Sequence, residues 1–288
     1  MSTAWQLRAR ALPLDRPLVM GIVNVTPDSF SDGGQFLDPD AAVAHARALL
    51  AEGADLLDVG GESTRPQGAR QVPVDEELRR VLPVVQALAM ECPEAVISVD
   101  TVKAAVAEAA VEAGAHIVND VSGLRLDSAM ADVCARTGVG VVVMHSRGGV
   151  SDMATYAHAE YGDFLDEMLG ELRERVNAVE RAGVRRDHIA VDPGIGFSKR
   201  PEHSLLALAC LERLAAWAYP VVVGVSRKRF IGQLTGATQP AQRRDGSLGA
   251  AVAAYDRGAR VFRVHDVGPT RHALDVAAAI RAAGEVGA

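Results

Sequence analysis

Eight apolar runs of this 288-residue chain each end in side chains that form hydrogen bonds or carry charge. The residues at these ends are Asn24, Asp58, Asp100, Asn119 with Asp120, His145, Asp192, Lys228, and Arg263 with His265. A single residue of this kind is more often a cap, or a buried group with satisfied hydrogen bonds, than part of a site. Eight ends of the same kind favour one shared site.

Asp100, Asn119, Asp192 and Lys228 combine hydrogen-bond donors with acceptors. A carboxylate accepts paired N–H bonds from a 2-amino-pyrimidinone, and an Asn side chain both donates and accepts. Lys donates to a carbonyl oxygen or a ring nitrogen. A site for phosphate alone would use Gly-rich backbone amides and cations, with few carboxylates. These four residues therefore predict a pocket for a flat, neutral heterocycle with an amide-like edge.

Asn24 follows the first apolar run, whereas Arg263 and His265 end the last one. A neutral amide beside Arg and His suits a polyanion, with a hard divalent cation bridging to it through oxygen ligands. We therefore expect the heterocycle deep in the site and a phosphate group at its rim. A Schiff base on Lys228, as in aldolase barrels, is a less favoured alternative, because Arg227 and Arg229 flank this lysine and suit anion contacts.

The elements that must position these residues alternate in type along the chain. The predicted strands are 18–23, 56–59, 95–99, 116–118, 139–144, 189–191, 221–225 and 260–264, with helices between them, as over 39–52, 74–90 and 161–182. The alternation predicts an α/β fold, a (β/α)8 TIM barrel whose chemistry lies at the carboxyl ends of the strands. We expect one domain over 1–288, with 1–17 as an N-terminal extension. Two doubly wound sheets are the alternative, but the chain has no linker and no Gly-x-Gly-x-x-Gly motif.

Charge and composition exclude several classes of protein. The net charge is −7 without a basic run, so neither nucleic acid nor a membrane is expected as a partner. The stretch 1–14 contains charges and no apolar core, so it is not a signal peptide, and the apolar runs are too short to span a bilayer. The three widely spaced cysteines predict neither a disulfide framework nor a zinc site. A cytoplasmic protein is expected.

Seven segments carry a more specific signal. They are Asn24-Val-Thr-Pro-Asp-Ser-Phe-Ser-Asp-Gly-Gly34, Gly60-Gly-Glu-Ser-Thr-Arg-Pro66, Ser98-Val-Asp-Thr101, Asn119-Asp-Val-Ser-Gly123, Asp192-Pro-Gly-Ile-Gly-Phe197, Ser226-Arg-Lys228 and Arg263-Val-His-Asp266. In this order, over about residues 18–280, the chain resembles the dihydropteroate synthase family of pterin-binding enzymes. The resemblance implies condensation of 6-hydroxymethyl-7,8-dihydropterin diphosphate with 4-aminobenzoate, giving dihydropteroate and pyrophosphate in folate synthesis. It also implies a requirement for Mg²⁺, a homodimer, and competition by sulfonamides as mimics of aminobenzoate.

The resemblance assigns the pterin to the deep residues. Asp100, Asn119, Asp192 and Lys228 would bind it, and Arg263 would stack on it. The family's mechanism is dissociative: diphosphate leaves first, and the exocyclic methylene becomes a cation delocalised into the ring. Deep carboxylates would stabilise that positive charge. No strong base is needed, because an aryl amine is already unprotonated at neutral pH.

The resemblance assigns the second substrate and the leaving group to other residues. Asn24 would be a ligand of Mg²⁺, while Arg263 and His265, together with Thr64, would hold the diphosphate. The residues around the aminobenzoate ring would be Phe30, Pro66, Phe197 and Lys228. The residues that would carry catalysis are Asp100, Asp192, Lys228, Arg263 and His265.

Three positions depart from the family's usual pattern. Ser-Arg-Gly follows His145, so the resemblance does not determine which side chains form the pocket wall there. Gln67 is an extra residue in its loop. Arg229 stands where a small Ser is frequent, near the expected carboxylate of aminobenzoate. We predict that Arg229 strengthens carboxylate binding, the alternative being that it points to solvent. An altered response to sulfonamides follows as a hypothesis.

Two alternative functions are disfavoured by the sequence, and two loops are predicted to move. A pterin-binding methyltransferase barrel is disfavoured, because it releases no diphosphate and would not need the last two motifs. A non-catalytic pterin-binding paralogue is disfavoured, because suitable residues occupy the motif positions. The loop Val25–Gly34, with Thr64–Val72, is predicted to close over the site once diphosphate and Mg²⁺ are bound.

Overall fold

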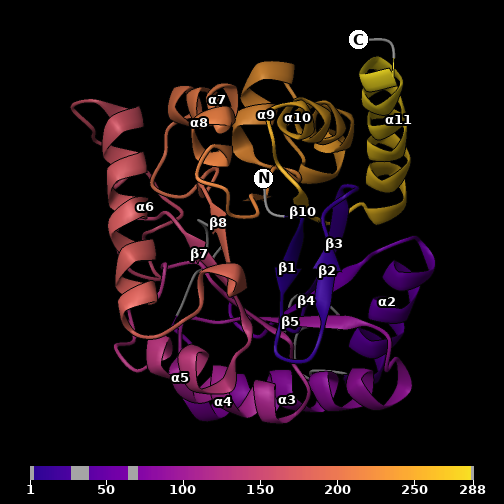
Figure 1. Cartoon of the computed structure of the whole chain (residues 1–288), viewed down its shortest axis with the longest axis vertical. Coiled ribbons are helices and arrows are strands. Elements are labelled where there is room, and N and C mark those ends of the chain that lie inside the picture. Colours follow the sequence, from indigo (N-terminus) through magenta and orange to yellow (C-terminus); the bar gives the residue numbers. More distant parts are fainter. Residues whose placement is uncertain (1–2, 27–38, 64–70, 287–288) are drawn as a thin grey trace.

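The computed structural model describes residues 3–26, 39–63 and 71–286 (Figure 1). Its strands are β1 (Ala4–Gln6), β2 (Ala11–Pro13), β3 (Leu18–Asn24), β4 (Leu56–Gly60), β5 (Val96–Asp100), β6 (Ile117–Asp120), β7 (Gly140–Met144), β8 (Ile189–Asp192), β9 (Val222–Val223) and β10 (Val261–Val264). Its helices are α2 (Pro39–Ala51), α3 (Val74–Glu91), α4 (Ala104–Glu112), α5 (Met130–Thr137), α6 (Phe164–Arg181), α7 (Pro201–Ala209), α8 (Leu211–Ala215), α9 (Arg229–Thr235), α10 (Arg244–Asp256) and α11 (Val267–Val286), with 3₁₀ turns η1 (Arg186–His188) and η2 (Pro240–Arg243).

Eight parallel strands form a single sheet in the order β8-β7-β6-β5-β4-β3-β10-β9. The two ends of the sheet meet where Val191 of β8 bridges to Val221, one residue before β9. There the Val191 amide donates to the Pro220 carbonyl oxygen at 2.9 Å. Helices surround this ring of strands (Figure 1). The predicted (β/α)8 barrel is therefore confirmed.

Several predicted boundaries are off by one to three residues, and two of them have a visible cause. The strand predicted over 221–225 is limited to Val222–Val223, because its ladder with β10 comprises only two residue pairs. The helix predicted from 161 begins at Phe164, because the Asp163 side chain accepts hydrogen bonds from the first turn and caps it there. Both errors lie at element ends, where side-chain contacts decide the boundary.

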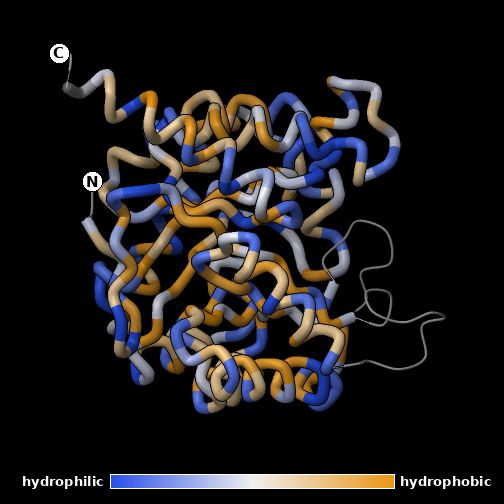
Figure 2. Tube along the Cα trace, turned by 90° about the vertical axis from the view of Figure 1, so that its right-hand side faces the viewer, coloured by the Kyte–Doolittle hydropathy of each residue, from blue (hydrophilic) through white to orange (hydrophobic). Residues whose placement is uncertain are grey.

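Each barrel strand packs on two sides, which explains the unbroken apolar runs. Val19 and Val23 of β3 belong to the large cluster shared with the helices, whereas Leu18 and Met20 belong to a separate cluster inside the barrel. The inner cluster takes residues from the other strands as well, namely Leu56, Val96, Ile117, Val142, Ala190, Val222 and Val261. Hydrophobic stretches accordingly run through the centre of the molecule (Figure 2).

The N-terminal hairpin β1–β2 closes the end of the barrel where the strands begin. Trp5, Leu7 and Leu14 join the inner cluster, and Trp5 is fully buried. The Trp5 indole N–H donates to the carbonyl oxygen of His188, just before β8, at 2.8 Å. In Figure 1 the hairpin lies in front of the barrel strands. With this end filled by side chains, a ligand has to enter at the carboxyl ends of the strands.

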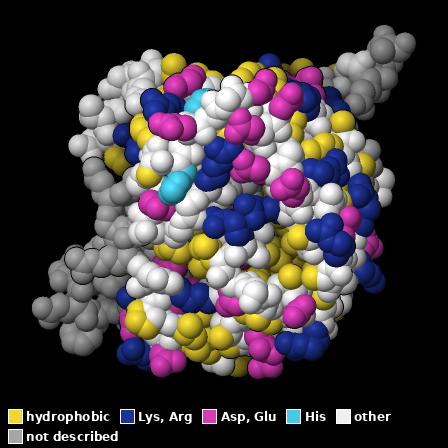
Figure 3. Space-filling model, turned by 90° about the vertical axis from the view of Figure 1, so that its left-hand side faces the viewer, with side chains coloured by type: hydrophobic (Ala, Val, Ile, Leu, Met, Phe, Trp, Pro, Cys, Tyr) yellow, Lys and Arg dark blue, Asp and Glu magenta, His cyan; other side chains and the backbone are white. Residues whose placement is uncertain are grey.

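The described surface fits the charge pattern of the sequence. Acidic and basic side chains are mixed over the face shown in Figure 3. None of the helices in the described part of the chain is long and apolar enough to cross a membrane.

Candidate active site

Arg263 of β10 links three other strands at the open end of the barrel. Its Nε donates to Asp58 Oδ2 at 2.6 Å, and its Nη2 donates to Asp100 Oδ2 at 2.7 Å. Asp58 Oδ2 also accepts from Asn119 Nδ2 at 3.0 Å. Asp58 is completely buried, so its charge needs this compensation. Side chains from β4, β5, β6 and β10 thus form one connected polar floor.

The electrostatics of this floor depend on how deeply it is buried. Burial raises the pKa of Asp100, and the nearby Arg263 cation opposes that rise. Burial alone would lower the pKa of Arg263, but the charges of Asp58 and Asp100 reverse the effect, so its pKa is raised. Arg263 is therefore a permanent cation held between two carboxyl groups. Because two carboxyl groups face this one guanidinium, the floor can still offset positive charge on a flat group placed above it.

Asp192 of β8 and Lys228, which precedes α9, complete the deep part of the site. Asp192 Oδ1 accepts from the Gly194 amide at 2.6 Å, and burial raises the pKa of Asp192 to about 6. Burial lowers the pKa of Lys228 to about 8. Lys228 Nζ lies 4.3 Å from the centre of the Phe197 ring, a cation–π contact. Gly196 has φ of +79°, and a Cβ there would come within 3.2 Å of Lys228 Cδ. A glycine at this position therefore leaves room for the Lys228 side chain.

Asn24 and His265 lie at the rim. β3 and β10 are paired, so these two residues end adjacent strands at the same end of the barrel. His265 Nδ1 lies 3.0 Å from Ser226 Oγ, which also accepts from the His265 amide at 3.2 Å. The next residue, Asp266, holds the Arg227 guanidinium by two hydrogen bonds of 2.6 and 2.9 Å. An amide, a histidine and a guanidinium therefore lie at this edge, and groups of these kinds suit an anion.

The comparisons with known proteins agree with this chemistry. A family model described as a pterin binding enzyme matches residues 20–265. The chain is 44% identical to the dihydropteroate synthase of Bacillus subtilis over 253 residues, which cover 88% of this chain and 85% of that protein. The chain belongs to the dihydropteroate synthase family. It is a transferase.

A longer relative and two solved structures extend the comparison. A probable bifunctional folylpolyglutamate synthase/dihydropteroate synthase of Haloferax volcanii is 45% identical over 267 residues, and the chain spans 31% of it. The Xanthomonas albilineans dihydropteroate synthase with 4-aminobenzoic acid superposes with a TM-score of 0.90 at 48% identity, covering 98% of this chain and 99% of that one. A structure of that enzyme with 7,8-dihydropteroate has a TM-score of 0.87, at 46% identity and 97% and 99% coverage. The Yersinia pestis enzyme with a sulfonamide drug has a TM-score of 0.89, at 41% identity and the same coverage.

Two acidic residues have environments that the sequence did not predict. Asp58 lies at the end of a predicted strand, but the sequence assigns it no function in the site. In the structure it is the buried counter-ion of Arg263. Asp120 ends β6 yet turns away from Asn119, because successive strand side chains face opposite sides. Its Oδ1 accepts from both the amide and the hydroxyl of Ser122. Asp120 is thus a buried structural group outside the polar floor.

The free energy of unfolding should fall less between pH 4 and pH 7 in an Asp120→Asn variant than in the unmodified chain. Burial raises the pKa of Asp120 to about 6 in the folded chain, against about 4 when unfolded. The stability that this group contributes is present below pH 4 and is lost as the pH rises through 6. Urea unfolding at both pH values should show a difference of about 1–3 kcal/mol between the variant and the unmodified chain. Asp245→Asn, on the surface, is the control; an equal pH dependence in Asp120→Asn would refute this account.

Arg229 makes contacts that neither predicted alternative included. Its Nη2 donates to the Ala154 carbonyl oxygen at 2.7 Å, and its guanidinium carbon lies 4.7 Å from the centre of the Tyr156 ring. The side chain therefore ties α9 to the segment that precedes α6. Its predicted contact with the aminobenzoate carboxylate stays a prediction.

Part of the predicted site lies outside the described residues. Phe30, Thr64, Pro66 and Gln67 belong to this part, as do most of the two loops predicted to close over the site. The described residues nearest to the second loop are anchored by Glu62, which accepts from the Val72 amide and from Lys103 Nζ. The contributions predicted for the four residues stay predictions.

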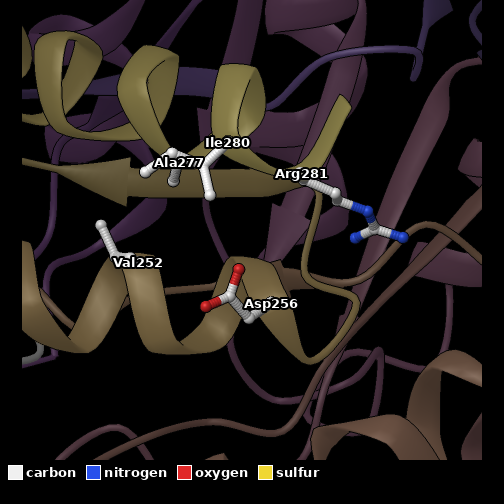
Figure 4. Close-up of a pocket in the computed structure, with 5 residues that line it drawn as sticks. All are labelled: Val252, Asp256, Ala277, Ile280 and Arg281. Carbon is white, nitrogen blue, oxygen red and sulfur yellow. The ribbon is translucent and has the colours of Figure 1, made fainter. Parts of the chain in front are cut away.

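Hollows on the outside of the barrel are separate from the strand ends. One lies between α10 and α11 and is lined by Val252, Asp256, Ala277, Ile280 and Arg281 (Figure 4). Another lies among α7, α9 and α10, with mostly apolar lining that includes Phe230 and Leu234. Neither contains the charged groups of the polar floor.

Proposed function

We propose that this chain condenses 6-hydroxymethyl-7,8-dihydropterin diphosphate with 4-aminobenzoate to give 7,8-dihydropteroate and pyrophosphate, in folate synthesis. The observation that carries the proposal is the buried floor in which Arg263 joins Asp58, Asp100 and Asn119. Such a floor would offer both acceptors and donors to a heterocycle. Relatives crystallised with 4-aminobenzoic acid and with 7,8-dihydropteroate support this assignment.

The pterin ring would lie over the deep residues. Asp192 would accept from the amino-pyrimidinone edge, Asn119 would donate and accept beside it, and Lys228 would donate to a ring nitrogen or carbonyl oxygen. Arg263 would lie against the ring. Asp100 and Asp192 would stabilise the positive charge that develops as the leaving group departs. That charge arises only in the reaction, so its stabilisation would accelerate the chemical step.

The diphosphate would lie at the rim, beside Asn24, Arg263 and His265, with Thr64 as a further contact. The described residues include no group of three or more His, Cys, Asp or Glu side chains suited to a metal ion. A single Asn oxygen at a strand end nevertheless fits Mg²⁺, which keeps several waters and binds through few protein oxygens plus substrate phosphates. Bound Mg²⁺ would offset the negative charge of the departing diphosphate.

Aminobenzoate would approach from the side of Phe197 and Lys228. Lys228 Nζ already packs over the Phe197 ring, so the two side chains present one apolar and one cationic surface. Phe30, Pro66 and Arg229 would complete this part of the site. The aryl amine is already unprotonated at neutral pH, so the mechanism needs no general base.

Sulfonamides would compete for the aminobenzoate position, as the Yersinia pestis enzyme bound to a sulfonamide drug supports. Arg229 and Gln67 would border such a drug, and we propose that they alter the response to it. Equal inhibition constants for sulfamethoxazole in the unmodified chain and in a Gln67-deleted Arg229→Ser variant would exclude it.

The chain would act as a homodimer in the cytoplasm. Leu234 is 63% exposed and Ile280 is 69% exposed, and both border the outer hollows on α9–α11. Exposed large apolar side chains beside a groove suit a second copy of the chain. Light scattering that gives the mass of a single chain at micromolar concentration would exclude the dimer.

Purified protein incubated with Mg²⁺, the pterin diphosphate and aminobenzoate should form dihydropteroate and an equal amount of pyrophosphate. Tight pterin binding without product would instead favour the non-catalytic paralogue. Methyl transfer from a methylated pterin to a corrinoid, with no dihydropteroate, would favour the methyltransferase.

Chelation of divalent cations should abolish product formation, and Asn24→Ala should raise the Mg²⁺ concentration for half-maximal rate by about tenfold. The reason is the loss of the only oxygen ligand that we assign to the protein. The rate is measured against Mg²⁺ concentration, with Asn177→Ala on α6 as the control. An unchanged Mg²⁺ dependence in Asn24→Ala would refute its role.

A further inference from the structure

A row of ionisable side chains ends at the backbone carbonyl of Phe197 and has no role in the proposed chemistry. Lys199 is 1% exposed and His145 is fully buried, while Glu171 on α6 is partly exposed. α6 packs beside β7, which ends just before His145 (Figure 1). The three residues therefore run from the helical surface to the loop that follows β8.

The hydrogen bonds fix the tautomer of His145. His145 Nε2 lies 3.2 Å from Glu171 Oε2, and Lys199 Nζ lies 2.8 Å from His145 Nδ1. Burial lowers the pKa of Lys199 to about 7, and its amino group can donate in either protonation state. The Glu171 carboxylate can only accept, so the neutral His145 ring carries its hydrogen on Nε2. Burial lowers the pKa of His145 to about 3, which agrees with a neutral ring. Lys199 donates next to the Phe197 carbonyl oxygen at 3.1 Å.

Ser198, between Phe197 and Lys199, is also held by hydrogen bonds. Its amide donates to the Met153 carbonyl oxygen at 2.6 Å, and its hydroxyl donates to the Arg147 carbonyl oxygen at 2.7 Å. Its φ of +48° is a left-handed conformation that few non-glycine residues adopt. The backbone that carries the Phe197 ring is therefore held by Ser198, in a strained conformation, and by the adjacent buried amino group of Lys199.

Burying a lysine is unfavourable unless it is well paired, and an apolar side chain of similar volume would often stabilise a fold as much. The carbonyl that Lys199 holds belongs to the residue whose ring faces Lys228. We propose that Glu171, His145 and Lys199 form a positioning chain, which sets the Phe197 ring against Lys228 and so determines the binding of aminobenzoate. This inference rests on the proposed function.

Replacing Lys199 with Met should raise the KM for aminobenzoate by about tenfold or more, because the Phe197 carbonyl and His145 Nδ1 lose their buried donor. The kcat and the KM for the pterin diphosphate should stay within about threefold, since the hydrogen bonds of Lys199 go to His145 and to the Phe197 carbonyl oxygen and not to the pterin residues. The matched control is Leu172→Ala, one residue from Glu171 but in the hydrophobic core. It should lower stability without raising the KM for aminobenzoate.

A double-mutant cycle separates positioning from general damage. Phe197→Leu should raise the same KM, and the double variant with Lys199→Met should be no worse than the more affected single variant, because both remove one contact. If Lys199→Met does not fold, Glu171→Gln, at the exposed end of the chain, should change the KM in the same direction by a smaller factor. Additive effects in the cycle, or equal losses for both substrates, would overturn the positioning chain. An inactive unmodified enzyme would instead refute the proposed function.

Discussion

Asp192→Asn is expected to lower kcat/KM for the pterin diphosphate by about 100-fold or more. The substitution keeps the shape of the side chain, and Asn Oδ1 still accepts from the Gly194 amide, which Asp192 now binds at 2.6 Å. The other acceptor becomes an NH₂ group that faces the donors of the pterin edge. A buried mismatch of this kind leaves both partners without a hydrogen bond.

The measurement combines turnover with pterin binding by calorimetry. Both should fall together, while the free energy of unfolding changes much less than the activity. Asp187→Asn is the matched control, because its side chain is half exposed and pairs with Arg185 on the surface. Near-normal turnover of Asp192→Asn would remove this residue from the pterin pocket.

Arg263→Ala is expected to lower both activity and stability. Asp58 is fully buried and Asp100 nearly so, and both lose their cation when the guanidinium is removed. Breaking a buried ion pair by removing one partner costs about 3–5 kcal/mol. Arg263→Lys should fall between, because an ammonium is a point charge without the planar fork that now reaches both carboxyl groups.

Urea unfolding and turnover of the two variants test this expectation. The matched control is Arg213→Ala, whose partner Asp166 is exposed, so the loss there should stay below about 1 kcal/mol. Equal losses of stability in Arg263→Ala and Arg213→Ala would show that the polar floor does not depend on Arg263.

The barrel could be predicted because its strands are covered on both faces. Runs such as 18–23 read as unbroken apolar sequence, and polar side chains begin where each strand reaches the open end. Strand alternation then decides which of two neighbours faces inward, which a sequence reveals only once the register is known. Without the register, the sequence places Asn119 and Asp120 together at one strand end, although only Asn119 joins the polar floor.

The positioning chain could not be predicted from local patterns. Lys199 lies 54 residues from His145, and Glu171 lies on an amphipathic helix among other charged residues. A lysine in such a sequence is usually exposed, whereas this one is 1% exposed and is bound to His145 and to the Phe197 carbonyl oxygen. Arg229 was a departure visible in the sequence, but its partners Ala154 and Tyr156 come from a segment without a recognisable pattern.

A crystal structure of the complex with pterin diphosphate and Mg²⁺ tests the central claim most directly. The ring should lie within hydrogen-bond distance of Asp100, Asn119, Asp192 and Lys228, with the diphosphate at the rim near Asn24 and His265. A ring bound at the rim with the diphosphate below it, or a pterin bound in the outer hollow between α10 and α11, would contradict the divided site.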